Sequence, residues 1–351
     1  MWAGVIADRR SSALRRTCAR AVLAALCGLA VACGGGGQPR SAAAPSPTPA
    51  VITMAQARQV VASYIATLNQ ANQQRDASLL GTVETEASYD IDSEAYGWTK
   101  ISDPNNSKYV RLAVAQATYY IPAKTAGAPW WVASVTWPPG TTYQNGVAEY
   151  LVFTRSGGKW LAARTPGLAS GAAVPAPAVG RQGAASELSA SQAASLAVQP
   201  SDIAAQMATY LTQLTVPLCP RPGLCGKPPA ARVQMPTATS QTDMSDLTFW
   251  RGQAGGALAV GEQHSPRTDQ VYAMATADGG ALVWCDVGAQ LSLAAPGGSA
   301  MHLQIPTFYT NDQSETQATV PYLDQYLVYD PPQGQGDARV VADLTGPIAK
   351  S

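Results

Sequence analysis

The strand-like segments of this chain follow one another in two series, with no helical segment inside either series. Four such runs, at 109–121, 130–137, 147–154 and 159–164, are rich in β-branched and aromatic residues and are separated by Gly, Pro and Asn clusters. Gly157 and Gly158 fit a hairpin turn between the last two runs. Because parallel sheets need strands that alternate with helices, this order predicts antiparallel pairing and argues against the solute-binding protein of a transporter.

An amphipathic helix precedes these strands. Thr53 and Gln56 have the spacing of a capping box. One apolar stripe at helical spacing follows, made of Ala57, Val60, Val61, Tyr64, Ile65 and Leu68. A second short helix is predicted at 76–83. The chain therefore begins its folded part as an α+β unit.

The same order occurs a second time after a segment of different composition. Residues 166–186 are rich in Ala, Gly and Pro without apolar periodicity, which indicates a linker. A helical stripe then spans 203–214, a Pro-rich loop spans 217–236, and strand-like runs follow at 247–250, 257–260, 270–275, 281–293, 301–308, 322–329 and 339–344. The segment 149–153 also matches 325–329 in sequence, either through duplication or through the shared composition of strands. We therefore predict two tandem α+β domains, 53–165 and 189–351, joined by a linker at 166–188, each with one or more helices packed on a curved antiparallel sheet.

The first 32 residues have the layout of an export signal. Five arginines (Arg9, Arg10, Arg15, Arg16 and Arg20) precede an apolar stretch of twelve residues, 21–32, and Cys33 follows. Twelve residues are too few for a membrane span, which needs roughly 20. The junction Leu29-Ala30-Val31-Ala32-Cys33 resembles the lipobox of bacterial lipoproteins, which implies cleavage before Cys33 and a lipid anchor on its sulfur. An ordinary secretory signal that contains a cysteine is the alternative.

A lipid anchor at Cys33 would hold the protein on the extracytoplasmic face of the cell membrane. Residues 33–52 would then be the lipidated cysteine and a Gly-, Ser-, Ala- and Pro-rich tether without the means to fold. The mature chain would have 351 − 32 = 319 residues, with 18 basic and 22 acidic side chains once five arginines and one aspartate are removed. A net charge near −4 argues against a nucleic-acid partner, whose phosphates need a basic surface.

Three cysteines remain beyond the signal and Cys33. Cys219 and Cys225 are separated by five residues that include Pro222-Gly223, so a turn can bring them within disulfide distance. We predict that these two are bridged and that Cys285, in an apolar strand-like run, is a buried free thiol. Pairing of Cys285 with either loop cysteine remains the alternative.

No catalytic or metal-binding motif stands out. G-x-S-x-G, H-E-x-x-H and C-x-x-C are all missing, and the two histidines, His264 and His302, lie in a predicted loop and a predicted strand. The five carboxylates between 84 and 94 fail the spacing of a calcium-binding EF-hand, because Ala95 and Ile101 occupy its glycine and glutamate positions. We predict a solvated acidic loop there, and no catalytic residue, metal or cofactor.

Aromatic residues gather on consecutive strands of the first domain. Alternation along a strand divides them between the two faces of the sheet, with one set under the first helix. The other set is predicted to line a concavity or to lie exposed, and an exposed aromatic patch marks an interaction site. The possible binding surface consists of Tyr119, Tyr120, Trp130, Trp131, Trp137 and Tyr150.

These features together resemble two known groups of proteins. The lipobox, the Pro-rich tether, the helix at 53–72 and the Trp130-Trp131 strand before Glu149 are similar to uncharacterised actinobacterial lipoproteins. Each domain also resembles the nuclear-transport-factor-like α+β cone, a fold shared by isomerases, dehydratases and non-catalytic scaffolds, so the resemblance assigns no activity. We favour a non-catalytic envelope lipoprotein that binds a small molecule or an envelope protein. The alternative is an extracytoplasmic enzyme that uses a carboxylate such as Asp76 or Asp92 in a cone-shaped pocket.

Overall fold

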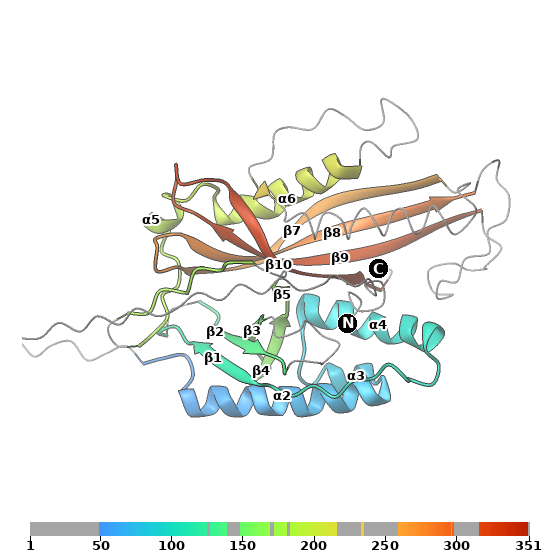
Figure 1. Cartoon of the computed structure of the whole chain (residues 1–351), viewed down its shortest axis with the longest axis horizontal. Coiled ribbons are helices and arrows are strands. Elements are labelled where there is room, and N and C mark those ends of the chain that lie inside the picture. The colour runs from blue at the N-terminus through green and yellow to red at the C-terminus, as the bar shows by residue number, and fades with distance from the viewer. Residues whose placement is uncertain are drawn as a thin grey trace, which may run out of the picture.

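Strands from both halves of the chain are hydrogen-bonded in one sheet (Figure 1). The computed structural model describes residues 49–124, 127–138, 148–168, 172–180, 183–215, 233–234, 259–295, 297 and 316–349. The ten strands of the sheet have the order β1-β2-β3-β5-β10-β9-β8-β7, with β4 paired to β3 and β6 paired to β10. The protein is thus an α+β protein with a large, almost wholly antiparallel sheet.

The first half consists of three helices followed by antiparallel strands. The helices are α2 (Met54–Gln74), α3 (Ala77–Leu80) and α4 (Glu86–Ser102). The strands are β1 (Gln116–Tyr120), β2 (Trp130–Thr136), β3 (Ala148–Ser156), β4 (Lys159–Arg164) and β5 (Gly167–Leu168). The predicted capping box of α2 is confirmed, since the Thr53 side chain accepts from Gln56 N and the Gln56 side chain accepts from Thr53 N.

The second half repeats the order of a helix and then a four-stranded meander. Its helices are α5 (Ala190–Ala193) and α6 (Pro200–Thr215). Its strands are β6 (Val233–Gln234), β7 (Ala259–Ala275), β8 (Ala281–Ala294), β9 (Gln317–Asp330) and β10 (Ala338–Pro347). Strand β7 runs through His264, where the sequence predicted a loop.

The two meanders meet at the short strand β5, where the sequence predicted a linker. Gly167 pairs with Glu149 of β3 on one side and with Asp343 of β10 on the other, so β5 joins the two halves into one sheet. This differs from the expected pair of separate sheets. Further along the same segment, Ala178 N donates to Ala275 O at 2.7 Å and Ala185 N donates to Ile121 O at 3.0 Å. Residues in this segment are small and show no apolar periodicity, yet backbone hydrogen bonds hold the segment in the fold. Side-chain composition does not reveal such bonds, so the sequence indicated a linker.

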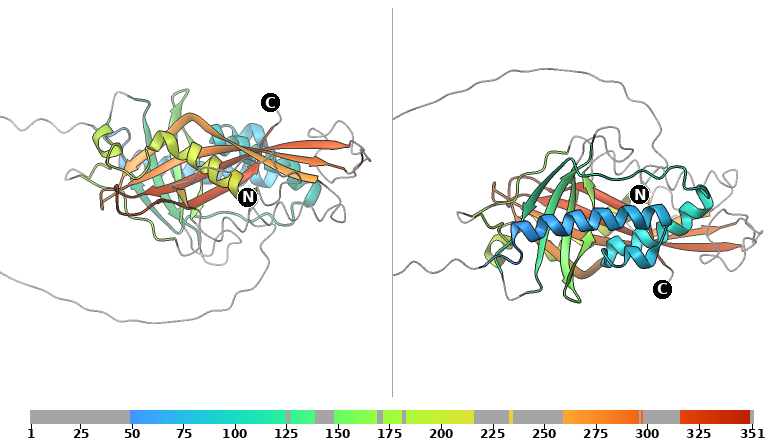
Figure 2. Two further views of the ribbon diagram at one scale, coloured as in Figure 1. Left: turned by 90° about the horizontal axis from the view of Figure 1, so that it is seen from above. Right: turned by 90° about the horizontal axis from the view of Figure 1, so that it is seen from below.

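Three of the apolar cores lie between successive layers, which gives four layers from α2 to α6 (Figure 1). Figure 2 shows α6 lying across the strands of the second half and, from the opposite side, α2 lying across the strands of the first half. The first core lies between α2 and one face of β2 and β3, where Trp131 and Phe153 stack at 4.5 Å. The second core lies between α6 and the strands β8 to β10. The third core lies between the two halves of the sheet, which face each other there, and it includes Tyr150 and Trp284. At these three cores, a sheet face is covered either by a helix or by the other half.

Helix α4 was not predicted from the sequence. It spans most of the acidic segment that was expected to be a solvated loop, and this expectation is wrong. Ala87 and Ile91 of α4 pack on Leu323 of β9, while Tyr96 belongs to the core under α2. Gly346 of β10 allows a close approach, because an added Cβ would lie 2.5 Å from Ile91 Cγ2. Helix α4 thus links the first core to the strands of the second half.

Candidate functional site

A groove of about 440 Å³ lies between α2 and the hairpin that joins β3 to β4. Its helical wall carries Gln56, Gln59 and Ser63, which are exposed and share one face of α2 by their spacing of three and four residues. Its opposite wall carries Arg155, Lys159 and Trp160. The groove is open to solvent and offers amide, hydroxyl, cationic and aromatic groups to a ligand.

The hairpin turn places the two basic residues at the groove. Gly157 and Gly158 have positive φ angles of 55° and 82°, which suit the tight two-residue turn that joins twisted antiparallel strands. Arg155 and Lys159 then flank the turn at the ends of β3 and β4, and both side chains are exposed. They are the charged side chains on the described lining of the groove, so its potential favours an anion.

Trp160 forms a firm aromatic wall. It is half-buried, and its ring meets Trp131 edge to face at 6.2 Å, with Trp131 itself stacked on Phe153. These contacts hold one part of the indole in the core and leave the rest on the lining of the groove. A planar or apolar portion of a ligand can pack on such a ring, while its anionic portion meets the two cations.

The floor of the groove leads to buried carboxylates. Tyr64 lines the groove and donates a 2.9 Å hydrogen bond to Glu84 Oε1. Burial and the charge of Asp92 raise the pKa of Glu84 well above its ordinary value, and burial raises the pKa of Asp92 as well. Burial also raises the pKa of Glu149 to about 7. Three carboxyl groups that share a desolvated space in this way tend to hold protons.

Two acidic residues from the sequence analysis have different positions. Asp92 is buried on α4, whereas the Asp76 side chain accepts from Leu79 N and caps α3. Asp76 therefore has a structural role as a helix cap. Glu84, which the sequence analysis placed in a solvated loop, and Glu149 of β3, which it did not propose as an acid, interact with Asp92 of α4. Within the described residues, no group of three or more His, Cys, Asp or Glu side chains is arranged to hold a metal ion.

The six aromatic residues proposed as a binding surface are mostly enclosed. Trp131 and Trp137 are buried under α2 and Tyr150 is buried in the third core, while Tyr119, Tyr120 and Trp130 are half-buried. Trp130 faces the second half of the sheet, with ring centroids 5.4 Å from Tyr272 and 6.3 Å from Trp284. The division between two faces occurs as predicted, but the face expected to be concave or exposed is covered by the other half of the chain.

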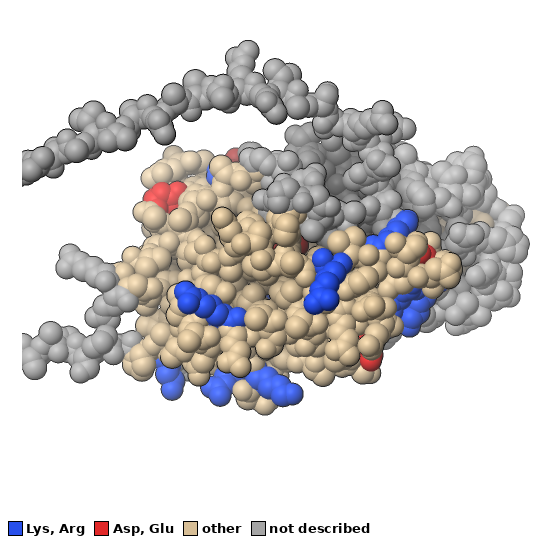
Figure 3. Space-filling view, turned by 60° about the horizontal axis from the view of Figure 1, so that its bottom comes forward, with Lys and Arg blue, Asp and Glu red and all other residues tan. Residues whose placement is uncertain are grey.

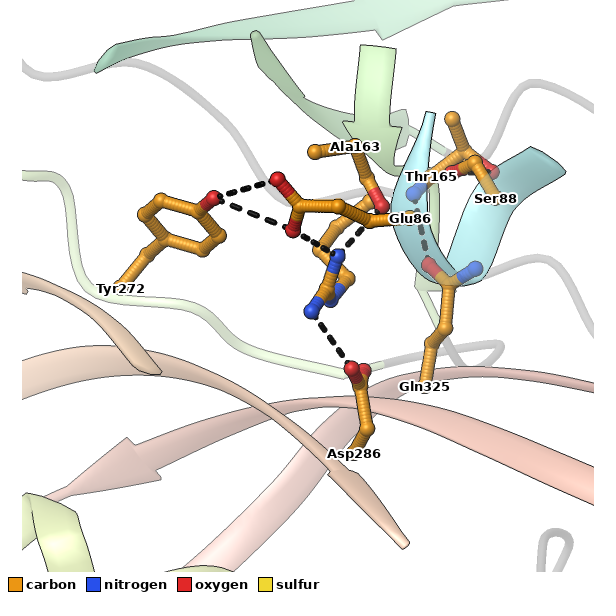
Figure 4. Close-up of polar contacts among 8 residues, drawn as sticks. Glu86, Ser88, Ala163, Thr165, Tyr272, Asp286 and Gln325 are labelled. Carbon is orange, nitrogen blue, oxygen red and sulfur yellow. Dashed lines mark hydrogen bonds and ion pairs between the residues drawn. The ribbon is translucent and has the colours of Figure 1, made fainter. Parts of the chain in front are cut away.

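A buried polar cluster lies where the two halves of the sheet meet (Figure 4). Arg164 of β4 forms ion pairs with Glu86 of α4 at 2.7 Å and with Asp286 of β8 at 2.6 Å. Tyr272 of β7 donates to Glu86 at 3.2 Å. Nearby, Gln325 Oε1 accepts from Thr165 N at 2.9 Å. Since Arg164 is only 3% exposed, this cluster stabilises the junction and is closed to a ligand.

The remaining predicted residues give no second site. His264 lies in β7, and burial lowers its pKa to about 4, so it is neutral near pH 7. Cys285 is a buried free thiol, as expected, and burial raises its pKa. Cys33, Cys219, Cys225 and His302 lie outside the described residues. Their lipidation and pairing stay predictions.

Comparison with known proteins places the chain in a family. Residues 47–351 match a family model described as "Domain of unknown function (DUF8094)". The chain belongs to this family. An "Uncharacterized lipoprotein" of Streptomyces avermitilis is 28% identical over 308 residues, which cover 83% of this chain and 84% of that relative. No solved structure matches the DUF8094 chain significantly. Among the helices of its described part, none combines the length and apolar character that a membrane span requires.

The groove was missed because no single segment of the DUF8094 sequence encodes it. Gln56 and Lys159 are about a hundred residues apart, and only the packing of α2 on β3 and β4 brings them together. A local signal does exist, since two basic residues flank a Gly-Gly turn that was itself predicted. What that turn faces depends on the tertiary fold.

Proposed function

We propose that this DUF8094 protein is a lipid-anchored, non-catalytic binding protein of the bacterial envelope, and that the groove between α2 and the β3–β4 hairpin holds an anionic ligand. The placement of Arg155 and Lys159 beside the Trp160 ring carries this proposal. Two cations attract an anionic group over a Debye length of about 8 Å at physiological ionic strength. The indole face and the amides of Gln56 and Gln59 would then orient the rest of the ligand. A small molecule or an acidic segment of an envelope protein fits this chemistry.

The lipobox at Cys33 and the name of the Streptomyces relative support the anchor. A mature chain that starts at Cys33 would have a tether of fifteen residues, 34–48, before the described chain begins at Pro49. A tether of this length in the flexible regime spans roughly 20 Å. The groove would then lie close to the outer surface of the membrane, because Ile52, close to the end of the tether, is one of its lining residues.

The anchor can be tested in membrane fractions. Wild-type protein is expected to partition with membranes and to carry lipid on residue 33, whereas Cys33→Ser should lose the lipid. Mass spectrometry of the N-terminal peptide measures both properties. A mature N-terminus at another residue, or an unmodified Cys33 in soluble wild-type protein, would contradict the proposal.

The groove can be tested by site-specific photocrosslinking in intact cells. A photoreactive amino acid at Gln59 should give an adduct, because this side chain is exposed and lines the groove. The adduct should disappear when Arg155→Gln and Lys159→Gln are introduced together. The same photoreactive residue at Gln335, exposed in the turn between β9 and β10, is the control for random encounters. Equal adducts at both positions, or adducts indifferent to the two substitutions, would refute a groove ligand.

A second candidate function is acid–base catalysis by the carboxylates under the groove. Glu84 Oε2 and Asp92 Oδ1 have no hydrogen-bond partner among the described residues, and Tyr64 connects Glu84 to the groove. A carboxyl group with a raised pKa can donate a proton near neutral pH. If the protein is an enzyme, Glu84→Gln should keep the Gln59 adduct but trap unreacted substrate in it. If the adduct has the same mass in wild type and Glu84→Gln, the non-catalytic proposal stands.

A further inference from the structure

Charged side chains are segregated by sign between the two halves of the described chain. In the described first half, Asp76, Asp90, Glu94 and Asp103 are only partly exposed, and the most exposed charged residues are all Lys or Arg. They are Lys124, beside the end of the tether, and a set that we name the basic face: Arg58, Lys100, Lys108, Arg111, Arg155 and Lys159. In the described part of the second half, the most exposed charged residues are the acids Asp202, Asp278 and Asp337 and one base, Arg339. Although the mature chain would have a net charge near −4, the basic face of its first half is positively charged.

The basic face surrounds α2, the outermost layer on its side of the molecule. Arg58 lies on α2 itself, and Arg155 and Lys159 lie across the groove from it. Lys108 and Arg111 lie on a segment held against α2, since Leu112 N donates to Asn69 Oδ1 at 2.7 Å and Asn106 Nδ2 donates to Gln73 O at 3.0 Å. Figure 3 shows this side of the molecule, on which Lys and Arg outnumber Asp and Glu.

Some acids near this face are buried or held by hydrogen bonds of the fold, while Asp90 and Glu94 of α4 are partly exposed and offset part of its positive charge. Asp103 accepts from the backbone N–H groups of Ser107 and Lys108 at 3.0 and 2.8 Å, and Asp76 caps α3. Glu84 and Asp92 are buried, and burial raises the pKa of each carboxyl. Neither side chain therefore adds negative charge to the surface.

The start of the folded chain lies on the same side. Lys124 N donates to Pro49 O at 2.7 Å, and Ala50 pairs with Ala123, so the chain that precedes α2 leaves the fold beside Lys124. An anchor at Cys33 would therefore pull this side toward the bilayer, within the tether length of roughly 20 Å. The acidic residues of the second half would lie on the far side, where an anionic surface repels them least.

We infer that the basic face docks on the anionic phospholipid headgroups of the membrane that holds the anchor. Each Lys or Arg close to an anionic membrane strengthens attachment about fivefold. Several such residues would add to the hold that a lipid anchor at Cys33 already gives on the membrane. Docking turns the groove toward the membrane, so its ligand is one presented at the membrane surface. This last step rests on the proposed function, whereas the docking itself does not.

Vesicle binding tests the docking separately from the groove. The mature-length chain with Cys33→Ser, which has no lipid of its own, is mixed with phosphatidylcholine vesicles that contain or lack phosphatidylglycerol. We expect binding only to the anionic vesicles, and binding that weakens as salt is added. Arg58→Gln, Lys108→Gln and Arg111→Gln together should weaken it roughly a hundredfold, by the product of three such factors. These three residues do not line the groove.

Two matched variants keep the test decisive. Gln263→Glu, Gln333→Glu and Gln335→Glu change the net charge by the same amount on exposed positions of the second half, and should leave binding unchanged. Arg58→Lys with Arg111→Lys keeps the charge and should also bind as wild type does. Equal losses in the two triple variants, binding to neutral vesicles, or binding to soluble polyphosphate but not to vesicles would each overturn the inference. The Gln59 adduct in cells, by contrast, should need Arg155 and Lys159 whatever the vesicle result.

Discussion

At the scale of single residues, the buried Arg164 is stabilised by the charged and aromatic groups around it. Arg164 has Glu86 and Asp286 on either side and lies 5.7 Å from the centre of the Tyr272 ring. Glu86 has a positive φ of 54°, a conformation that costs a residue other than glycine about 1 to 2 kcal/mol. The ion pair with Arg164 offsets part of this cost. The cluster therefore fixes the start of α4 against β4 and β8.

Arg164→Met tests the contribution of this ion-pair cluster. Removal of the guanidinium leaves the carboxylates of Glu86 and Asp286 without their cation in the junction. We therefore expect the free energy of unfolding to fall by about 3 to 5 kcal/mol. Urea denaturation measures this change. Arg155→Met, on the exposed end of β3, is the control and should stay within about 0.5 kcal/mol of wild type. Similar losses in the two variants would show that burial of Arg164 is not the cause.

Glu149 predicts a particular dependence of stability on pH. Burial raises its pKa in the folded protein from 4.5 to about 7, so the folded state binds the proton more tightly than the unfolded state does. The stability gained from this proton is complete below about pH 4.5 and is lost as the pH rises through about 7, at up to about 1.4 kcal/mol per pH unit. Glu149→Gln should flatten this part of the stability curve.

The control for this measurement is Asp202→Asn, an exposed carboxylate of α6, which should keep the wild-type slope. Glu84 and Asp92 have raised pKa values too, so Glu149→Gln should reduce the slope without abolishing it. A slope that is unchanged in Glu149→Gln would contradict the effect of burial on this carboxyl.

At the scale of elements, α2 determines both the first core and one wall of the groove. Thr53 and Gln56 satisfy the free N–H groups at its N-terminus, and Gln56 also faces the groove. The buried stripe of α2 covers Trp131 and Phe153 on the sheet. A change at the cap is therefore expected to act on stability and on the groove together.

Thr53→Ala should destabilise the protein by about 1 kcal/mol, because the hydroxyl that accepts from Gln56 N is lost. Thermal unfolding measures the loss, and photocrosslinking at Gln59 measures its effect on the groove. Thr53→Ser retains the hydroxyl and is the matched variant. If Ser and Ala at this position are equally stable, the capping bond contributes nothing measurable.

At the scale of the whole molecule, the sheet unites what the sequence presents as two domains. Strand β5 connects β3 with β10, and the third core places Val132, Tyr150 and Val152 of the first half against residues of the second half. A first half produced alone would expose this apolar face. The two halves are therefore expected to depend on each other for stability.

Chemical denaturation should accordingly give one transition. Tryptophan fluorescence reports mainly on the first half. Among the described tryptophans, Trp284 lies in the second half and the others lie in the first: Trp98, Trp130, Trp131, Trp137 and Trp160. Far-ultraviolet circular dichroism reports on both halves. Coincident curves are expected from a single cooperative unit. Two midpoints, with fluorescence following only one of them, would instead favour separate tandem domains.

Local patterns in the sequence determined the elements of this protein. The capping box and stripe of α2, the β3–β4 hairpin and the stripe of α6 depend on residues within a few positions of each other, and all of them form where they were predicted. The placement of Trp130 and Trp131 on opposite faces follows in the same way from the period of a strand. The proposed location of the protein at a membrane also rests on a local pattern, at Cys33.

The tertiary structure alone decided what each of these faces meets. No local pattern states that the free face of β2 and β3 packs on the other half of the sheet, that β5 pairs with β10, or that Asp92 of α4 is buried. These outcomes depend on contacts between residues more than a hundred positions apart, which one sequence does not record. The groove and the basic face have the same origin, since α2 and the β3–β4 hairpin become neighbours only when the first core forms.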